Sequence, residues 1–254
     1  MNLHVETQGS GAPLLLIHGW GMHGGVWADV AQKLSADFQV HSVDLPGNGT
    51  SAPLPETNLD ALVQALSGRF SEPLTVCGWS LGGQIALRWA VLVPEQVQRL
   101  ILVTSTPCFA EREGWLFGMA KVVLAKFAAE LEQSHEATLR RFIALQLRGS
   151  ENERELMMLL REQLFGRGQP DMAALRGGLD ILRDVDLRGE LEHIRQPTLV
   201  IAGERDKLTP PQASHYLAQT MPAARMVEVA GAAHAPFLSH PEIFVEQIKR
   251  FLHE

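Results

Sequence analysis

A serine enclosed by glycines, between a strand pattern and a helix pattern, constrains this chain more than any other stretch. Residues 75–87 read TVCGWSLGGQIAL, so a short apolar run leads into the motif GWSLG and then into apolar residues at helical spacing. We interpret the segment as a strand, a sharp turn and a helix. A serine at the tip of such a turn has a strained backbone, and Gly78 and Gly82 are needed because a Cβ there would collide with the crossing chain. The pattern predicts that Ser80 is an exposed nucleophile beside an anion site formed by helix amides.

A second glycine-rich segment follows another apolar run upstream. Residues 14–18 (LLLIH) do not alternate in polarity, which is typical of a strand buried on both faces, and residues 18–25 (HGWGMHGG) come directly after it. Glycines at such a place let the backbone approach a ligand closely. We therefore expect the amides of Trp20 and Leu81 to form an oxyanion hole, and the alternative is a flexible turn. Together the two segments argue against a chance match of the motif around Ser80.

Apolar runs alternate with helix patterns through most of the chain. Besides the strand before Ser80, strands are expected at residues 3–8, 14–18, 38–43, 99–104, 197–202 and 225–229, and helices at 26–34, 58–70, 211–219 and 241–252. Strand alternating with helix predicts an α/β fold, with a mostly parallel sheet and helices on both faces.

The pattern changes between residues 108 and 190. This stretch has no convincing strand run, and helices are expected at 114–131, 134–148, 151–165 and 172–182, separated by glycine-containing breaks at 149–150 and 166–170. The sheet pattern then resumes. We therefore predict a helical lid, residues 108–190, inserted into an α/β core formed by residues 1–107 and 191–254.

Composition excludes several classes of function. The 254 residues carry a formal charge of −7, with 29 acidic against 22 basic residues, so nucleic acid is a poor candidate partner. The two cysteines, Cys77 and Cys108, form no C-x-x-C pair and are expected to be buried free thiols. The chain starts without a leader pattern and contains no apolar run approaching 18 residues, so we expect a soluble, cytoplasmic protein outside the membrane. A monomer with no metal and no cofactor is expected.

Serine needs a base within hydrogen-bond reach, and that base needs an acceptor on its other nitrogen. Asp206 follows an expected strand, and His234 lies in the loop after the next one, in the chain order serine, acid, histidine. Carboxyl ends of parallel strands share one edge of a sheet, where such folds place their sites. Ser80, Asp206 and His234 are therefore the predicted catalytic triad.

Other residues could fill the acid and base roles. Asp44 also follows a strand but precedes the serine, in a turn-rich loop where a carboxylate often caps amides. His18 lies at the first glycine-rich loop, where a structural hydrogen bond is the simpler account. Three more aspartates near the lid exit are expected to be surface or capping groups, and His240 is expected to begin the last helix; the aspartates are Asp180, Asp184 and Asp186.

The triad predicts acyl transfer to water. His234 removes the Ser80 proton, the alkoxide attacks an ester carbonyl, and the two amides hold the oxyanion. The alcohol leaves with a proton from His234, and water activated by the same ring releases the acid.

With these residues in place the chain resembles the α/β hydrolases over almost its whole length. More narrowly it is similar to the family of pimeloyl-[acyl-carrier protein] methyl ester esterases of biotin synthesis. The segments that carry the resemblance are residues 18–21 (HGWG), 78–83 (GWSLGG), 141–146 (RFIALQ), 177–182 (GGLDIL) and 234–241 (HAPFLSHP). The resemblance implies an α/β-hydrolase fold and hydrolysis of a methyl ester on a pimeloyl chain carried by acyl-carrier protein.

The resemblance also implies a substrate site around the triad, formed with Trp20, Leu81 and five lid residues, Phe142, Ile143, Ala144, Leu145 and Gln146. From the residues alone, Gln146 shares a predicted helix face with Phe142 and Ile143, so a polar amide lies on an otherwise apolar stripe. It either bonds a substrate oxygen or marks the edge of a core face.

A basic patch on the lid is a further implication, because carrier proteins are acidic. The candidate docking residues are Arg140, Arg141, Arg148 and Arg154. Glutamates intervene between and after them, and mixed charges are also typical of a solvated helix face.

Two other functions compete with this interpretation. A general short-chain carboxylesterase or thioesterase of the same fold shares every catalytic residue and differs only in the lid. A binding module that kept the fold as a ligand pocket has no need of the complete set Ser80, Asp206 and His234. An ester assay with Ser80→Ala separates an enzyme from such a module.

Overall fold

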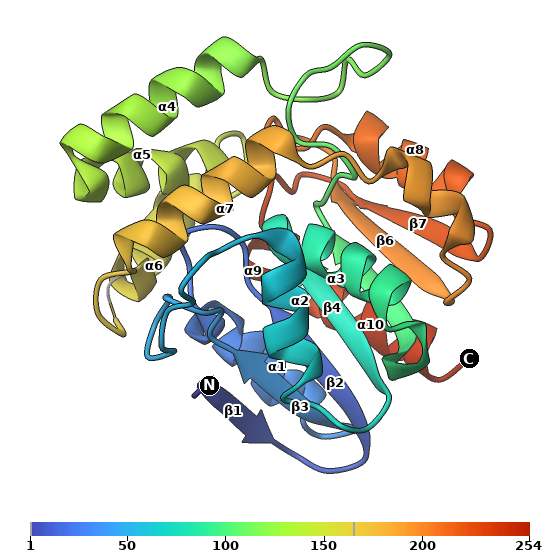
Figure 1. The fold of residues 1–254 in the computed structure, drawn as a ribbon. Coiled ribbons are helices and arrows are strands. Elements are labelled where there is room, and N and C mark those ends of the chain that lie inside the picture. The colour runs from blue at the N-terminus through green and yellow to red at the C-terminus, as the bar shows by residue number, and fades with distance from the viewer. Residues whose placement is uncertain (1, 165) are drawn as a thin grey trace.

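The computed structural model describes residues 2–164 and 166–254. Met1, the first residue of the predicted core, and Phe165, the last residue of a predicted helix, lie outside the described residues. A seven-stranded sheet runs through the centre in the order β1-β3-β2-β4-β5-β6-β7 (Figure 1). The strands are β1 (Val5–Gln8), β2 (Ala12–Ile17), β3 (Phe38–Val43), β4 (Leu74–Trp79), β5 (Val97–Val103), β6 (Thr198–Gly203) and β7 (Ala224–Val229).

All neighbouring strands are parallel except β1 and β3, so the predicted mostly parallel sheet is confirmed. Every residue of β4 and β6 is buried, because helices cover both faces of these central strands. The strands expected from the sequence agree with these bounds to within two residues at each end.

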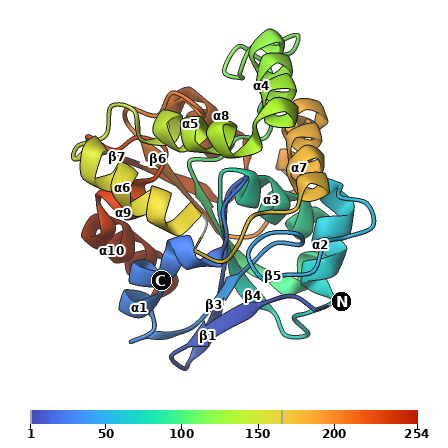
Figure 2. The ribbon, with the colours of Figure 1, turned by 90° about the vertical axis from the view of Figure 1, so that its left-hand side faces the viewer.

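Helices cover the sheet on both sides. α1 (Ala28–Leu34) contacts α10 (Pro241–Leu252) on one face, and α2 (Leu59–Ser67) contacts α3 (Leu81–Leu92) on the opposite face (Figure 2). α8 (Pro211–Thr220) packs on β6 and β7. In α10 the buried residues Phe244, Val245, Ile248 and Phe251 recur at helical spacing, so one stripe faces the sheet.

An aromatic cluster stiffens the core beneath the carboxyl ends of the central strands. Phe237, in the short helix α9 (Pro236–Ser239), lies with its ring centroid 4.1 Å from that of Trp27 and 5.0 Å from that of Trp79. All three rings are buried. No sequence pattern predicts α9, because four residues are too few to show a helical period.

Within the described residues, four α-helices lie between β5 and β6, over one end of the sheet (Figure 1). They are α4 (Lys121–Gln133), α5 (His135–Leu147), α6 (Glu153–Leu164) and α7 (Met172–Asp184). α4 packs on α5 and α7, and α5 packs on α6. The expected helices at 134–148, 151–165 and 172–182 correspond to α5, α6 and α7, although the end of the second falls on Phe165.

The helix expected at 114–131 was wrong in its first turns, since α4 begins only at Lys121. Arg112 and Trp115 instead form an antiparallel bridge, and Gly114 between them has a φ of +69°. Trp115 is buried, donates from Nε1 to the Cys108 carbonyl at 2.8 Å and packs edge-to-face on Tyr216 of α8 at 5.0 Å. Burial of one indole thus overrides local helix propensity.

Both cysteines are buried free thiols, as predicted. Burial raises the pKa of the Cys77 thiol far above its usual value, so this sulfur remains protonated. Within the described residues, no group of three or more His, Cys, Asp or Glu side chains could hold a metal ion, and no helix is both long and apolar enough to cross a bilayer.

The buried Trp115 side chain predicts how two substitutions affect stability. Trp115→Ala is expected to lower the free energy of unfolding by about 3–5 kcal/mol, because it empties a buried aromatic site. Phe117→Ala removes a neighbouring ring that is 37% exposed and should cost about 1 kcal/mol or less. Urea denaturation measures both changes, and equal losses of unfolding free energy would contradict the stabilising role of Trp115.

Candidate active site

Ser80 lies at the turn between β4 and α3, with φ 55° and ψ −116°. A Cβ on Gly78 would lie 2.2 Å from the Gly82 carbonyl oxygen, and one on Gly82 would lie 2.5 Å from the Ile17 carbonyl oxygen. Only glycine fits at either place, as predicted. The Ser80 amide donates to the Val103 carbonyl at 3.0 Å, so the turn is also bonded to β5.

Asp206 and His234 form a buried pair at the same edge of the sheet. Asp206 follows β6, and His234 follows β7. The His234 ring donates from Nδ1 to Oδ2 of Asp206 at 2.8 Å, and both side chains are almost fully buried. The other carboxylate oxygen accepts the amides of Leu208 at 2.8 Å and Thr209 at 3.1 Å. A proton on Nδ1 leaves Nε2 free to act as a base.

The His234 backbone is held from two directions. Its amide donates to the Gln146 carbonyl of α5 at 3.0 Å. Its carbonyl accepts the indole N–H of Trp79, the residue before Ser80, at 2.8 Å. The Trp79 and His234 rings lie 5.8 Å apart. The histidine is therefore fixed beside the serine turn. No sequence pattern marks the Gln146 carbonyl, because every residue carries a backbone carbonyl.

The predicted oxyanion loop touches the serine turn. A Cβ on Gly19 would lie 3.3 Å from Cβ of Ser80, so the two segments are in close contact. Among the described residues, the amides of Trp20 and Leu81 donate to no protein acceptor outside regular helices and strands, and Leu81 is the first residue of α3. Both donors thus remain available for a ligand oxygen.

The competing acid and base candidates have structural roles. The buried His18 ring bonds the Gly19 carbonyl through Nδ1 at 2.7 Å, while its Nε2 accepts the Leu45 amide at 3.0 Å. Burial lowers the pKa of His18 to about 4, although the Gly19 bond and the nearby Asp44 charge oppose this shift. Asp44 accepts the amides of Gly24 at 2.7 Å and Thr50 at 3.0 Å, which is the capping role expected for it.

The remaining alternatives also lie in structural contacts. Asp180 and Asp184 pair with Arg183 on α7, and Asp186 pairs with Arg188. His240 precedes α10 as its N-cap residue, as expected.

Trp20 joins the oxyanion loop to the helices above it. Its indole N–H donates to the Leu175 carbonyl of α7 at 2.9 Å, and its ring meets Phe127 at 5.5 Å and Phe142 at 5.0 Å edge-to-face. A Cβ on Gly178 would lie 2.6 Å from Cδ1 of Trp20. Glycine at this position of α7 therefore lets the indole pack against the helix.

An apolar cavity of about 40 Å³ lies beside these rings. Its lining includes Phe127 and Phe142 from the helices and Leu208, two residues after Asp206, from the core. The other lining residues are Phe109, Met119, Val123, Leu124, Leu145, Leu179 and Leu182. The cavity has no polar lining surface, so it suits a hydrocarbon chain.

The five predicted lid residues are spread around α5, since a helix turns by about 100° per residue. Phe142, Ile143 and Gln146 are buried, whereas Ala144 and Leu145 line an outer groove of about 480 Å³ between α4 and α5. Within the described residues, Oε1 of Gln146 has no hydrogen-bond partner although it is buried. A buried unpaired amide oxygen is suited to a ligand donor.

The candidate docking arginines differ in their contacts. Arg140 and Arg141 are engaged by Glu136 and Glu130, the former at 2.7 Å. Arg148 lines the outer groove, and both Arg148 and Arg154 are exposed.

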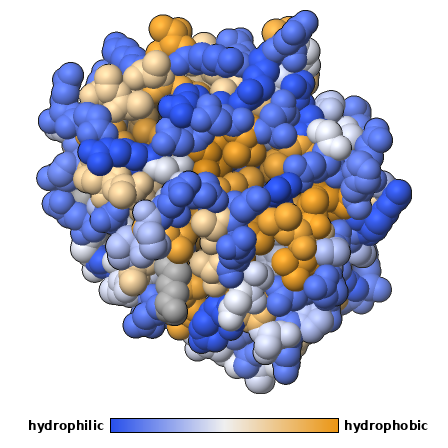
Figure 3. Space-filling model, in the orientation of Figure 1, coloured by the Kyte–Doolittle hydropathy of each residue, from blue (hydrophilic) through white to orange (hydrophobic). Residues whose placement is uncertain are grey.

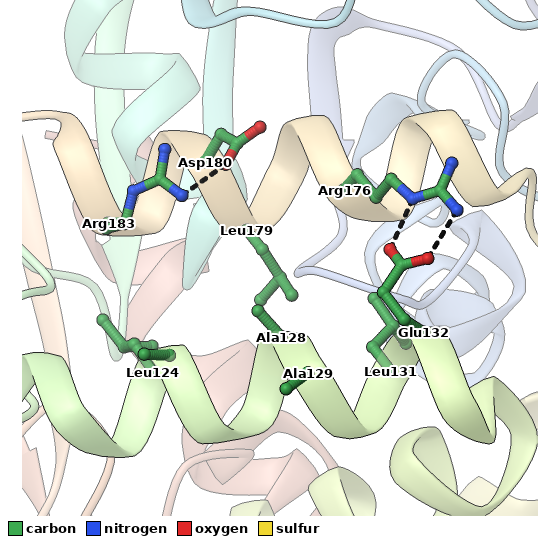
Figure 4. A pocket seen from close by; sticks show the side chains of 10 residues that line it. Leu124, Ala128, Ala129, Leu131, Glu132, Arg176, Leu179, Asp180 and Arg183 are labelled. Atoms are coloured by element: carbon green, nitrogen blue, oxygen red, sulfur yellow. Dashed lines mark hydrogen bonds and ion pairs between the residues drawn. The ribbon is translucent and has the colours of Figure 1, made fainter.

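A second groove, of about 400 Å³, runs between α4 and α7 (Figure 4). Leu124 and Leu179 form part of its floor and also line the apolar cavity. Arg176 of α7 pairs across the groove with Glu132 of α4 at 2.6 Å, whereas Arg183 pairs with Asp180 along α7 at 2.8 Å (Figure 4). On this face of the molecule, apolar atoms gather between rows of polar side chains (Figure 3).

This fold, with a strained serine turn and a buried carboxylate–imidazole pair at one sheet edge, defines an α/β hydrolase. The model of a family described as alpha/beta hydrolase fold matches residues 12–241. A pimeloyl-[acyl-carrier protein] methyl ester esterase of Nitrosomonas europaea is 45% identical, over 96% of this chain and 97% of its own. The enzyme of the same name from Chromobacterium violaceum is 42% identical, over 99% and 98%. The chain therefore belongs to this family of esterases within the α/β hydrolases.

Solved structures share the fold at lower identity. An esterase from Exiguobacterium antarcticum superposes with a TM-score of 0.88 at 22% identity, covering 99% of this chain and 96% of that one. A bromoperoxidase from Bacillus anthracis superposes with a TM-score of 0.90 at 20% identity, covering 99% and 95%. Both predictions, the fold and the family, are confirmed.

Burial of His18 predicts a pH dependence of stability. The folded ring protonates near pH 4, whereas an exposed imidazole protonates near 6.5. Between these values the unfolded chain binds more protons, so stability present above pH 6.5 is lost as the pH falls toward 4, by at most about 3 kcal/mol from this ring.

Urea midpoints measured from pH 7 to 4.5 test this dependence. His18→Asn should flatten the profile because it removes the titrating ring, whereas His215→Asn, at an exposed site of α8, should keep the wild-type slope. Identical slopes for all three proteins would rule out the role of His18.

Proposed function

We propose that this chain hydrolyses the methyl ester of pimeloyl-[acyl-carrier protein] to pimeloyl-[acyl-carrier protein] and methanol, the reaction that the sequence resemblance assigns to biotin synthesis. The observation that carries the proposal is the buried 2.8 Å bond between Asp206 and His234 beside the strained turn at Ser80. It stands in a chain 45% identical, over nearly its full length, to a relative of that name.

The chemistry uses five groups. His234 takes the Ser80 proton on Nε2, and the alkoxide attacks the ester carbonyl. The amides of Trp20 and Leu81 stabilise the oxyanion, while Asp206 stabilises the imidazolium. Methanol leaves with the proton from His234. Water then gives its proton to the same ring, attacks the acyl-enzyme and releases the carboxylic acid with free Ser80.

Residues 108–190 act in this proposal as a lid over the site. The apolar cavity under α4, α5 and α7 takes part of the methylene chain, because it offers only hydrocarbon contacts. Phe142 lines this cavity and packs edge-to-face on Trp20, and the unpaired Oε1 of Gln146 accepts a hydrogen bond from a donor on the substrate arm.

The carrier protein docks on the outer face of the lid. Lys126, Arg141 and Arg148 surround the groove between α4 and α5, which shares Val123, Phe127 and Leu145 with the apolar cavity. A prosthetic arm entering this groove therefore leads its acyl group toward the site, while the cations attract an acidic carrier. Arg140 and Arg154 extend the same docking surface.

Loss of the nucleophile should abolish turnover. Ser80→Ala is expected to lower kcat by about a millionfold, since no other group can form the acyl-enzyme. Methanol release from the carrier-linked ester measures it. Ser67→Ala, at the end of α2, is the matched control and should keep full activity; substantial turnover by Ser80→Ala would contradict the mechanism.

Charge reversal on the lid should affect only the carrier-linked substrate. Arg148→Glu with Arg154→Glu is expected to raise KM for pimeloyl-[acyl-carrier protein] methyl ester about tenfold or more at low salt, with a smaller effect at high salt. The KM of this double variant for the free methyl ester of pimelic acid should be unchanged. Arg225→Glu, at the start of β7, is the control and should leave the KM for both substrates unchanged.

The same assay separates the proposal from a general carboxylesterase. The wild-type kcat/KM for the carrier-linked methyl ester should be well above its kcat/KM for the free methyl ester. Equal efficiency on both substrates would leave an esterase without the specific assignment.

A further inference from the structure

Thr104, directly after β5, has a backbone that its residue type disfavours. Its φ is 39°, and it is fully buried. A β-branched residue at positive φ is an outlier that persists only where its surroundings hold it. Glycine could adopt this backbone without strain, so the strain at Thr104 indicates that its side chain makes contacts that glycine could not make.

Two polar groups of Thr104 bond different segments of the site. Its amide donates to the Ile201 carbonyl of β6 at 2.7 Å, and its hydroxyl donates to the His234 carbonyl at 2.7 Å. Its carbonyl oxygen lies 2.9 Å from the hydroxyl of Thr209. Thr104 thereby connects β6 with the histidine loop, and its carbonyl contacts the loop after Asp206.

Thr209 contacts the charged pair directly. Its Oγ1 lies 2.7 Å from Oδ2 of Asp206 and 3.3 Å from Nδ1 of His234, and the residue is 2% exposed. The hydroxyl has one proton, and the carboxylate is both the nearer and the charged acceptor, so the proton goes to Oδ2. This is the oxygen that also accepts the His234 proton.

Asp206 is therefore held at both oxygens. Oδ1 accepts the amides of Leu208 and Thr209, and Oδ2 accepts the Thr209 hydroxyl together with the imidazole. Without the hydroxyl, Oδ2 keeps only the imidazole as a donor among the described residues, so the carboxylate is less restrained in its rotation about the Cβ–Cγ bond. The ring then loses its orientation toward the serine.

We propose that Thr209 is a positioning residue for the hydrolysis, whose hydroxyl fixes the Asp206 carboxylate and, through it, the His234 ring. This inference rests on the proposed function. Thr209 contacts no reacting atom, so its effect falls on the rate of the chemical steps and not on substrate binding.

The experiment compares Thr209→Val with Thr209→Ser on p-nitrophenyl butyrate, a substrate that needs no carrier protein. Thr209→Val keeps the size of the side chain and removes the donor, and kcat is expected to fall about 10- to 100-fold with KM within about twofold. Thr209→Ser keeps the donor and should retain kcat within about threefold.

Thr198→Val is the matched control. Thr198 is also fully buried, and its hydroxyl donates to the Gln196 carbonyl at 2.9 Å, but it begins β6 at the opposite end from Asp206. This variant should lose stability in urea as Thr209→Val does, and keep the wild-type kcat.

The outcomes distinguish the two hypotheses. Wild-type kcat in Thr209→Val, or an equal fall in Thr198→Val, overturns the positioning role while the esterase stands. A wild-type protein without esterase activity, or an active Ser80→Ala, overturns the proposed function and this inference with it. If Thr209→Val does not fold, Thr209→Cys replaces it, and its weaker S–H donor should give a kcat between those of wild type and Thr209→Ala.

Discussion

The close backbone contact at the serine turn, where Gly78 lies against Gly82, is the constraint on which the rest of the structure depends. The Cβ positions of Gly78 and Gly82 are occupied by backbone atoms, so no change of rotamer could relieve a larger residue. Strain of the kind found at Ser80 costs about 1–3 kcal/mol. The turn persists because β4 is buried and paired on both sides, with β2 and β5. A rigid central strand therefore fixes where the proposed nucleophile stands.

The histidine loop depends on the helices between β5 and β6 as well as on the core. Besides the bond from His234 to Gln146, the Ala233 amide donates to Oγ of Ser150 at 3.2 Å, and the Glu151 amide donates to the Gly231 carbonyl at 3.2 Å. The junction of α5 and α6 is thus bonded along the loop that presents the imidazole. These helices therefore help to hold the loop that carries His234.

Trp20 makes the corresponding connection on the oxyanion side. Its backbone lies in the loop against Ser80, while its indole is bonded to α7 and packed on rings from α4 and α5. One residue therefore ties the predicted oxyanion donor to three helices. A shift of these helices would therefore displace the Trp20 amide, because the rigid indole of the same residue is packed against them.

The sequence by itself determined the strands, most helices and the chain order of Ser80, Asp206 and His234, because apolar periodicity and glycine spacing are local properties. It misplaced the start of α4, since only the fold brings Tyr216 against Trp115. The support of the site was likewise decided by tertiary structure. Thr104, Thr209 and the Gln146 carbonyl are ordinary groups in the sequence, and they acquire their contacts only when strands and loops distant along the chain meet at one sheet edge. A hydrogen bond depends on distance in space, which residue order does not specify.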